Sequence, residues 1–197
     1  LTKHPIKYDA IIVDEAQDFL KDYWVIIEEL LNRDGIFYIF YDPEQNIFDK
    51  DQDFPIKDTP HILSKNCRNT LSICKELQTY TSQIRPMKGL PEGQPVAKIV
   101  CHSDKEMRKH LGSVIHCLVS EQRLANRRIV ILGMEHSIQD TFLKNDIRLG
   151  NFMIVDNHEE ERHNCIRYYS YRRFKGCEAD AIVLLDVNPE DKRWSRK

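Results

Sequence analysis

Short runs of β-branched and apolar residues alternate along this chain with segments whose apolar residues recur at helical spacing. This alternation is typical of a parallel β-sheet with helices on its faces, so it predicts an α/β fold. Most of the runs are apolar at consecutive positions, which favours strands covered on both faces. The predicted strands are 10–13, 36–41, 61–63, 97–101, 128–132, 152–155, 166–170 and 181–185.

Four segments between these strands predict helices. In the first, Leu20, Trp24, Ile27 and Leu31 recur at helical spacing, and Gly35 follows as the predicted helix stop. A helix in this place joins the first two strands in a short β-α-β crossover. The other predicted helices are 104–124, opened by a capping box of Ser103 and Glu106, then 69 or 70 to 77, and 138–143.

The charge balance excludes some classes of protein. The 29 Lys and Arg residues nearly match 31 Asp and Glu, so the 197-residue chain is neither a strongly basic nucleic-acid coat nor a polyacidic tail. Apolar runs stay well short of the roughly 20 residues that cross a bilayer, and the N-terminal residues lack an apolar signal-peptide core. We therefore expect a cytoplasmic protein with no membrane partner.

Adjacent carboxylates follow the first predicted strand directly, at Asp14 and Glu15. Ligands of open parallel sheets bind at the carboxyl ends of the strands. One carboxylate can hold Mg²⁺ on nucleotide phosphates while the next orients or deprotonates a water. Alternatively, these acids only favour the positive N-terminus of the following helix. The residues alone leave both interpretations open.

The second predicted strand also ends in a polar stretch, 42–48, which should lie beside Asp14 and Glu15. Within it, the Gln45 side chain can hydrogen-bond a γ-phosphate or an attacking water. The alternative is a proline-containing turn whose Asp42 and Asn46 cap the backbone.

Four segments in order resemble motifs II, III, IV and V of superfamily 1 DNA helicases of the UvrD/Rep type. These segments are Val13-Asp14-Glu15-Ala16-Gln17-Asp18, 42–48, 63–70 and 170–180, and the resemblance spans residues 8–187. It implies a RecA-like, P-loop NTPase type of parallel sheet. Residues 1–57 would then complete a first RecA-like domain, and residues 58–197 would form most of a second.

The resemblance also implies roles for residues around a nucleotide. It assigns Asp14 as Mg²⁺ ligand, Glu15 as catalytic base, Gln45 as γ-phosphate sensor, Arg68 as a phosphate contact from the second domain, and Glu178 as a ribose contact. A guanidinium suits the phosphate contact because it stays charged and can grip two oxygens.

On the DNA side, the resemblance implies that Lys175 and Gly176 shape the turn between phosphate and nucleic acid, and that Ser170 and Arg172 face single-stranded DNA. Phe48 either stacks on a base or packs as a strand-end aromatic. The family pattern is altered at four positions: Tyr41 replaces Gly, Cys67 replaces Tyr, and Ser170 and Arg172 replace Thr and His.

The sequence contains no Gly-x-x-x-x-Gly-Lys-Ser/Thr loop to cradle phosphates, and no match to the family's downstream arginine-finger motif. We therefore expect an internal fragment of an ATP-dependent helicase that uses ATP and Mg²⁺ and acts on single-stranded or partly duplex DNA. The fragment alone should not hydrolyse ATP. The alternative is a non-hydrolysing adaptor with a helicase fold that binds protein or nucleic acid. The oligomeric state is not predicted.

Overall fold

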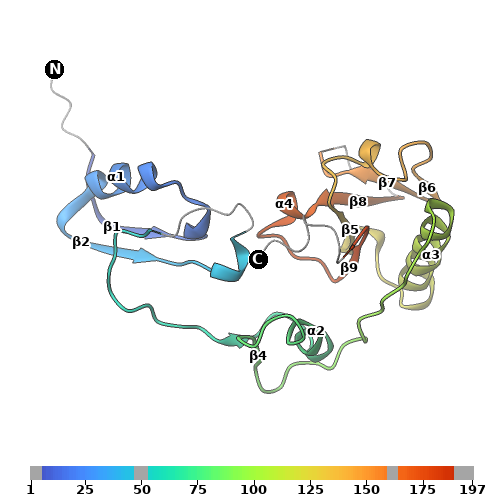
Figure 1. Ribbon diagram of the computed structural model, residues 1–197, viewed down its shortest axis with the longest axis horizontal. Helices are drawn as coiled ribbons and strands as arrows, with labels where there is room; N and C mark the ends of the chain where they lie inside the picture. The colour runs from blue at the N-terminus through green and yellow to red at the C-terminus, as the bar shows by residue number, and fades with distance from the viewer. Residues whose placement is uncertain (1–5, 47–52, 159–163, 189–197) are drawn as a thin grey trace. The chain divides into compact units, whose positions relative to one another are not determined.

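The chain forms two compact units, Leu1–Pro95 and Val96–Lys197, each with its own sheet (Figure 1). The computed structural model describes residues 6–46, 53–158 and 164–188. The fold is mixed α/β, as the sequence predicts, and its largest element is a five-stranded, mostly parallel sheet in the second unit. The boundary at 57/58 between two RecA-like domains stays a prediction.

The first unit opens with a parallel pair of strands joined by a helix. These elements are β1 (Tyr8–Val13), α1 (Lys21–Leu30) and β2 (Leu31–Ile39), so the predicted crossover is confirmed. The strand β2 begins directly after the helix because Leu31 is already extended and pairs with Tyr8. Gly35 therefore lies inside β2, and its prediction as a helix stop is wrong.

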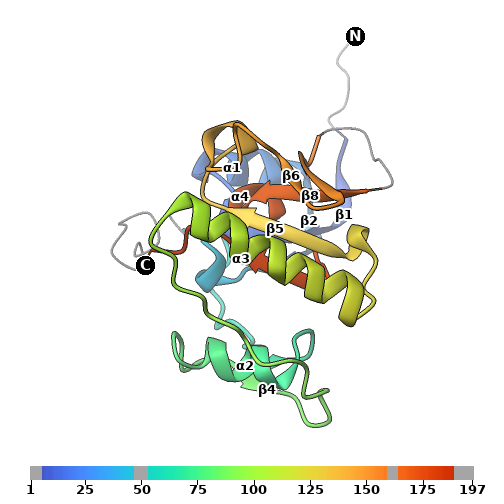
Figure 2. The same cartoon turned by 90° about the vertical axis from the view of Figure 1, so that its right-hand side faces the viewer.

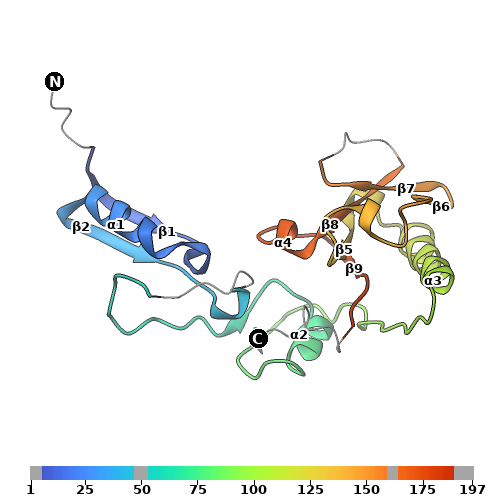
Figure 3. The same ribbon diagram turned by 45° about the horizontal axis from the view of Figure 1, so that its top comes forward.

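The helix α1 packs on one face of the β1–β2 sheet (Figure 3). The core between them contains Trp24 and Val13, with Phe37 packed against it. The opposite face leaves Ile12 and Tyr38, which pair across the strands, 66% and 57% exposed. The expectation of strands covered on both faces is wrong for this sheet, because α1 covers one face only.

The rest of the first unit is a small substructure of β3 (Lys65–Asn66), α2 (Leu71–Leu77) and β4 (Arg85–Pro86). The two short strands pair in parallel. The Thr70 side chain caps α2 by accepting a hydrogen bond from the Ile73 backbone N–H at 3.4 Å. Residues 61–63 form no strand, contrary to the prediction, and Leu63 is 81% exposed.

The second unit is built on the sheet β6-β7-β8-β5-β9. Only the β6–β7 pair is antiparallel. The strands are β5 (Ile129–Gly133), β6 (Arg148–Leu149), β7 (Phe152–Asp156), β8 (Cys165–Ser170) and β9 (Ala181–Leu184), and the helices are α3 (Asp104–His116) and α4 (Tyr171–Phe174).

Apolar side chains cover both faces of β5, as its continuous apolar run predicts. On one face, Leu111 and Ile115 of α3 pack in the same cluster as Ile131. Figure 2 shows α3 running along this side of the sheet. On the other face, Phe174 of α4 packs with Val130. All five residues of β5 are buried, so the core of this unit is centred on β5.

The predicted helix 104–124 is confirmed over α3, which continues into one π-helical turn, Cys117–Glu121. Its cap is also confirmed, since the Ser103 hydroxyl accepts a hydrogen bond from the Glu106 backbone N–H at 3.3 Å. The predicted helix 138–143 forms only a 3₁₀ turn, Ile138–Asp140.

Residues 97–101 are not a strand, because they find no pairing partner within the described residues. None of the helices described is long and apolar enough to span a bilayer.

Tyr168 is a buried phenol at the centre of the second unit, 1% exposed. Its hydroxyl donates a hydrogen bond to the Glu135 carbonyl oxygen at 2.9 Å. Burial, followed by the negative charges of Asp186, Glu135 and Asp156, raises the pKa of Tyr168 above its ordinary value. The folded protein therefore keeps this proton at pH values where the unfolded chain releases it.

We predict that Tyr168 lowers the stability of the second unit as pH rises above 10.0, the ordinary pKa of a tyrosine. The sign follows because the unfolded state binds fewer protons than the folded state above this pH. Urea unfolding of wild type and Tyr168→Phe at about pH 9 and about pH 11 checks the prediction. The variant should lose less stability across this interval, and equal losses would contradict the assignment.

Candidate functional site

The turns that follow β1 and β2 meet at one edge of the first sheet. Val13 pairs with Ile39 in the parallel register, so both strands end at the same level. Beyond this pair, the Phe40 N–H donates to the Val13 carbonyl oxygen at 2.8 Å, and the Ala16 N–H donates to the Phe40 carbonyl oxygen at 3.0 Å. These bonds tie the two turns together, and the predicted proximity of the two polar stretches is confirmed.

Glu15 turns the chain at the end of β1. Its backbone lies in the left-handed region, at φ 52 and ψ 38, which non-glycine residues rarely adopt. The Asp14 carboxylate accepts a hydrogen bond from the Glu15 backbone N–H at 2.9 Å and steadies this turn. The Asp14 side chain is exposed at the sheet edge, whereas Glu15 is half-buried.

Gln17 follows two residues later in the 3₁₀ turn Ala16–Asp18 and is 1% exposed. Its side-chain amide nitrogen donates to Glu15 Oε2 at 2.7 Å, and its amide oxygen accepts from the Asp42 backbone N–H at 3.0 Å. Gln17 is not among the site residues predicted from the sequence. The available signal was a polar side chain beside Ala16, in the turn that follows the apolar strand.

Gln45 lies across this edge in a second 3₁₀ turn, Pro43–Gln45. Its side-chain amide donates to Asp42 Oδ2 at 2.8 Å, and its backbone N–H donates to the Asp42 carbonyl oxygen at 3.1 Å. The hydrogen bonds therefore connect Glu15, Gln17, Asp42 and Gln45 in sequence. The structure brings the predicted residues Asp14, Glu15 and Gln45 together at one sheet edge.

The donor atoms at this edge suit a magnesium ion. Asp14 and Glu15 offer carboxylate oxygens, the hard ligands that Mg²⁺ prefers, and Asp14 is exposed to solvent. In the described part of the chain, no group of three or more His, Cys, Asp or Glu side chains is arranged to hold a metal. Mg²⁺ in nucleotide sites needs only one or two carboxylates, because phosphates and waters complete its shell.

Arg68 lies in the turn between β3 and α2 and is exposed. The Asn66 side-chain oxygen accepts hydrogen bonds from the backbone N–H groups of Arg68 and Asn69, at 3.2 and 3.1 Å. These bonds fix the backbone that carries the guanidinium. The role of Arg68 as a phosphate contact stays a prediction, and Phe48 lies outside the described residues.

The predicted DNA-facing residues of the second unit differ in exposure. Ser170, at the end of β8, is 4% exposed, and its hydroxyl has no hydrogen-bond partner within the described residues. The predicted contact between its side chain and DNA does not fit this burial. Arg172 is exposed, and its guanidinium lies beside the Tyr171 ring, with Nε donating to the Tyr171 hydroxyl at 2.9 Å. The role of Arg172 as a DNA contact stays a prediction.

Lys175 and Gly176 form a tight turn after α4. Lys175 has φ −50 and ψ 132, Gly176 has φ 78, and the Cys177 N–H donates to the Phe174 carbonyl oxygen at 2.9 Å. These values define a type II β-turn, whose third residue needs a positive φ and is usually Gly. The two residues do form a turn, its place between phosphate and nucleic acid stays a prediction, and Glu178 is exposed just beyond it.

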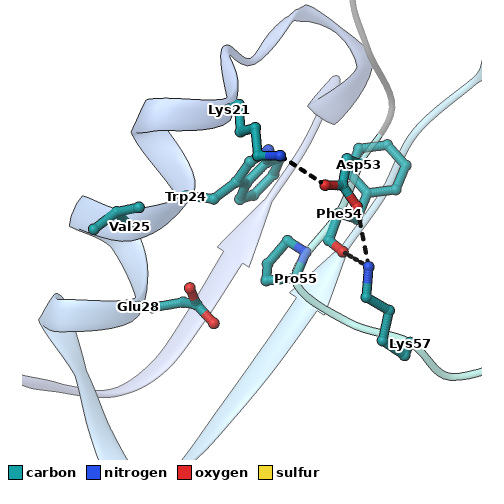
Figure 4. A pocket seen from close by; sticks show the side chains of 8 residues that line it. All are labelled: Lys21, Trp24, Val25, Glu28, Asp53, Phe54, Pro55 and Lys57. Carbon is teal, nitrogen blue, oxygen red and sulfur yellow. Dashed lines mark hydrogen bonds and ion pairs between the residues drawn. The ribbon is translucent and has the colours of Figure 1, made fainter.

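A pocket of about 170 Å³ lies between α1 and residues 53–57 (Figure 4). The Asp53 carboxylate forms ion pairs with Lys21 at 3.2 Å and Lys57 at 3.0 Å. Hydrogen bonds from these ammonium groups hold the pKa of Asp53 below its ordinary value, and Lys57 has the larger effect. Trp24 also lines the pocket, and none of the predicted site residues does. The pocket and the carboxylate edge are therefore separate features.

Comparison with protein-family models and with curated proteins gave no match to this chain.

We predict opposite effects for the same substitution at two glycines. Gly176→Ala should destabilise the second unit by about 1 kcal/mol because alanine disfavours a positive φ. Gly112→Ala, in the middle of α3, should stabilise it by roughly 0.5–1 kcal/mol. An added Cβ meets nothing within 4 Å at either position, so the comparison isolates the backbone. Urea unfolding measures both effects. A Gly176→Ala variant as stable as wild type or more stable would contradict the turn assignment, and a destabilised Gly112→Ala variant would contradict the expectation for α3.

Proposed function

We propose that this chain is part of an ATP-dependent DNA helicase or translocase of the superfamily 1, UvrD/Rep type. In this proposal its units belong to RecA-like domains, and the complete gene product couples ATP hydrolysis to movement on single-stranded DNA and to duplex unwinding. The 197-residue chain alone is expected not to hydrolyse ATP, because it contains no Gly-x-x-x-x-Gly-Lys-Ser/Thr loop.

One observation carries the proposal. Segments that resemble motifs II and III lie at the same edge of a parallel sheet, joined through Glu15, Gln17, Asp42 and Gln45. A turn that only capped the following helix would need neither the contact with the β2 turn nor the left-handed backbone of Glu15. Strained backbone of this kind often lies at functional sites.

The side chains at this edge have distinct roles in the proposed hydrolysis. Asp14 would hold Mg²⁺, which when bound neutralises charge on the phosphates of ATP. Glu15 would accept a proton from the attacking water, and its hydrogen bond from Gln17 would orient the carboxylate. Gln45 presents an amide at the neighbouring turn, where it can sense the γ-phosphate.

Residues outside this edge complete the proposal. Arg68 would contact phosphate, and Glu178 would meet the ribose. The exposed Arg172 offers a positive charge and a guanidinium plane to single-stranded DNA. The turn at Lys175 and Gly176 would link the nucleotide and DNA sides of the second unit, so that nucleotide-driven closure changes the grip on DNA.

ATP hydrolysis by the complete gene product, with and without single-stranded DNA, tests this function. We predict DNA-stimulated turnover that Glu15→Gln lowers by about 100-fold or more, because a neutral amide cannot accept the proton. The matched control is Glu29→Gln, the same change at an exposed residue of α1. It should leave turnover unchanged.

Two outcomes would contradict the proposal. Folded full-length protein without ATP turnover would exclude the motor and favour a non-hydrolysing adaptor. Turnover that survives Glu15→Gln would remove Glu15 from the proton transfer. The isolated 197-residue chain, assayed in parallel, should be inactive.

A further inference from the structure

We propose that Gln17 is the positioning residue that couples the Glu15 carboxylate to the turn carrying Gln45. This inference rests on the proposed function and deepens it, because it names the group through which the two motifs communicate. Gln17 itself is 1% exposed, so it acts through its neighbours and does not touch the nucleotide.

The geometry gives Gln17 one bond on each side. Its amide nitrogen donates to Glu15 Oε2 at 2.7 Å, and its amide oxygen accepts from the Asp42 N–H at 3.0 Å. The residues it joins are 27 apart in sequence, and they follow different strands. A shift of one turn therefore changes the geometry of the other.

The chemistry of a primary amide fits this position closely. The bond to Glu15 needs a donor, and the bond to the Asp42 backbone needs an acceptor. An amide supplies both in one side chain, whereas a carboxylate supplies only acceptors and a methionine neither donor nor strong acceptor. Because Gln17 is buried, water cannot replace a lost bond without entering the core, so each bond is costly to remove.

The link continues on the far side of Asp42. Gln45 is tied to Asp42 through its side-chain amide at 2.8 Å and through its backbone N–H at 3.1 Å. Movement of Gln45 with a γ-phosphate therefore pulls on Asp42, and the Gln17 amide transmits that movement to Glu15. Hydrolysis would in this way depend on the γ-phosphate being correctly sensed.

A purely structural role for Gln17 predicts different results from a positioning role. Loss of a structural bond changes stability and leaves the turnover of folded protein intact. Loss of a positioning bond lowers kcat while the KM for ATP stays the same, because the alignment matters in the transition state. The test therefore needs both a readout of the turn and a readout of the reaction.

Hydrogen exchange of the complete gene product reads the turn. Gln17→Met keeps a similar volume and removes both bonds, so the peptide covering residues 40–46 should exchange faster at Asp42. Gln17→Glu keeps an acceptor for the Asp42 N–H, so this peptide should stay protected. The matched control is Gln139→Met, the same change at an exposed residue of the second unit. It should leave the peptide unchanged.

ATP turnover of the same proteins reads the reaction. Both Gln17→Met and Gln17→Glu lose the donor to Glu15, so both should lower kcat by about 10- to 100-fold at unchanged KM. Gln139→Met should retain full activity. Thermal unfolding of each protein verifies that the measured population is folded.

The outcomes separate this inference from the proposed function. Unchanged exchange at Asp42 in Gln17→Met overturns the bridge, whatever the activity. Faster exchange with normal kcat overturns the positioning role and leaves a structural bond. Wild type without turnover contradicts the helicase motor and the positioning role that rests on it, while the exchange data still decide the bridge itself.

Discussion

The parallel pairing of β1 with β2 is the constraint on which the candidate site depends. Parallel strands cannot be joined by a tight hairpin, so the chain must return to the start of the sheet before β2 begins. The ten residues of α1 rise by roughly 15 Å, which with its flanking turn returns the chain along the six residues of β1. Trp24 anchors α1 to the sheet through the apolar core. It is 4% exposed and stacks on Phe19, with 5.2 Å between the ring centres. The carboxyl ends of both strands consequently share one edge.

Elements with a strong local pattern could be predicted from the sequence. The amphipathic spacing of α1 and α3 specifies helices whose backbone hydrogen bonds are local. The continuous apolar run of β5 also predicts a strand, which pairs with the distant strands β8 and β9. Residues 61–63 and 97–101 have the same β-branched character, yet Leu63 and Val100 are 81% and 75% exposed and unpaired in the described structure. Strand formation depends on a neighbour to pair with, and short segments do not encode that neighbour.

The candidate site shows a similar division. The adjacency of Asp14, Glu15 and Gln45 could be predicted, because it follows from strand order and the direction of a parallel pair. The role of Gln17 as a link between the two turns could not be predicted from the sequence. Its two hydrogen bonds join turns that are distant in sequence, and they depend on the burial of one amide. The burial of Ser170 was missed for a similar reason. The end of β8 is enclosed by the second unit's core, which the local pattern of residues 166–170 does not reveal.

The backbone conformation of Glu15 creates a trade-off between the stability of the protein and its proposed activity. A left-handed conformation costs a side chain with a Cβ roughly 1–2 kcal/mol, whereas glycine adopts it freely and asparagine with less penalty. Variants selected for thermal stability alone would therefore drift toward glycine or asparagine at position 15. Under the proposed function the same variants would lose their proton acceptor. Residue 15 is then a position where a more stable protein is a less capable one.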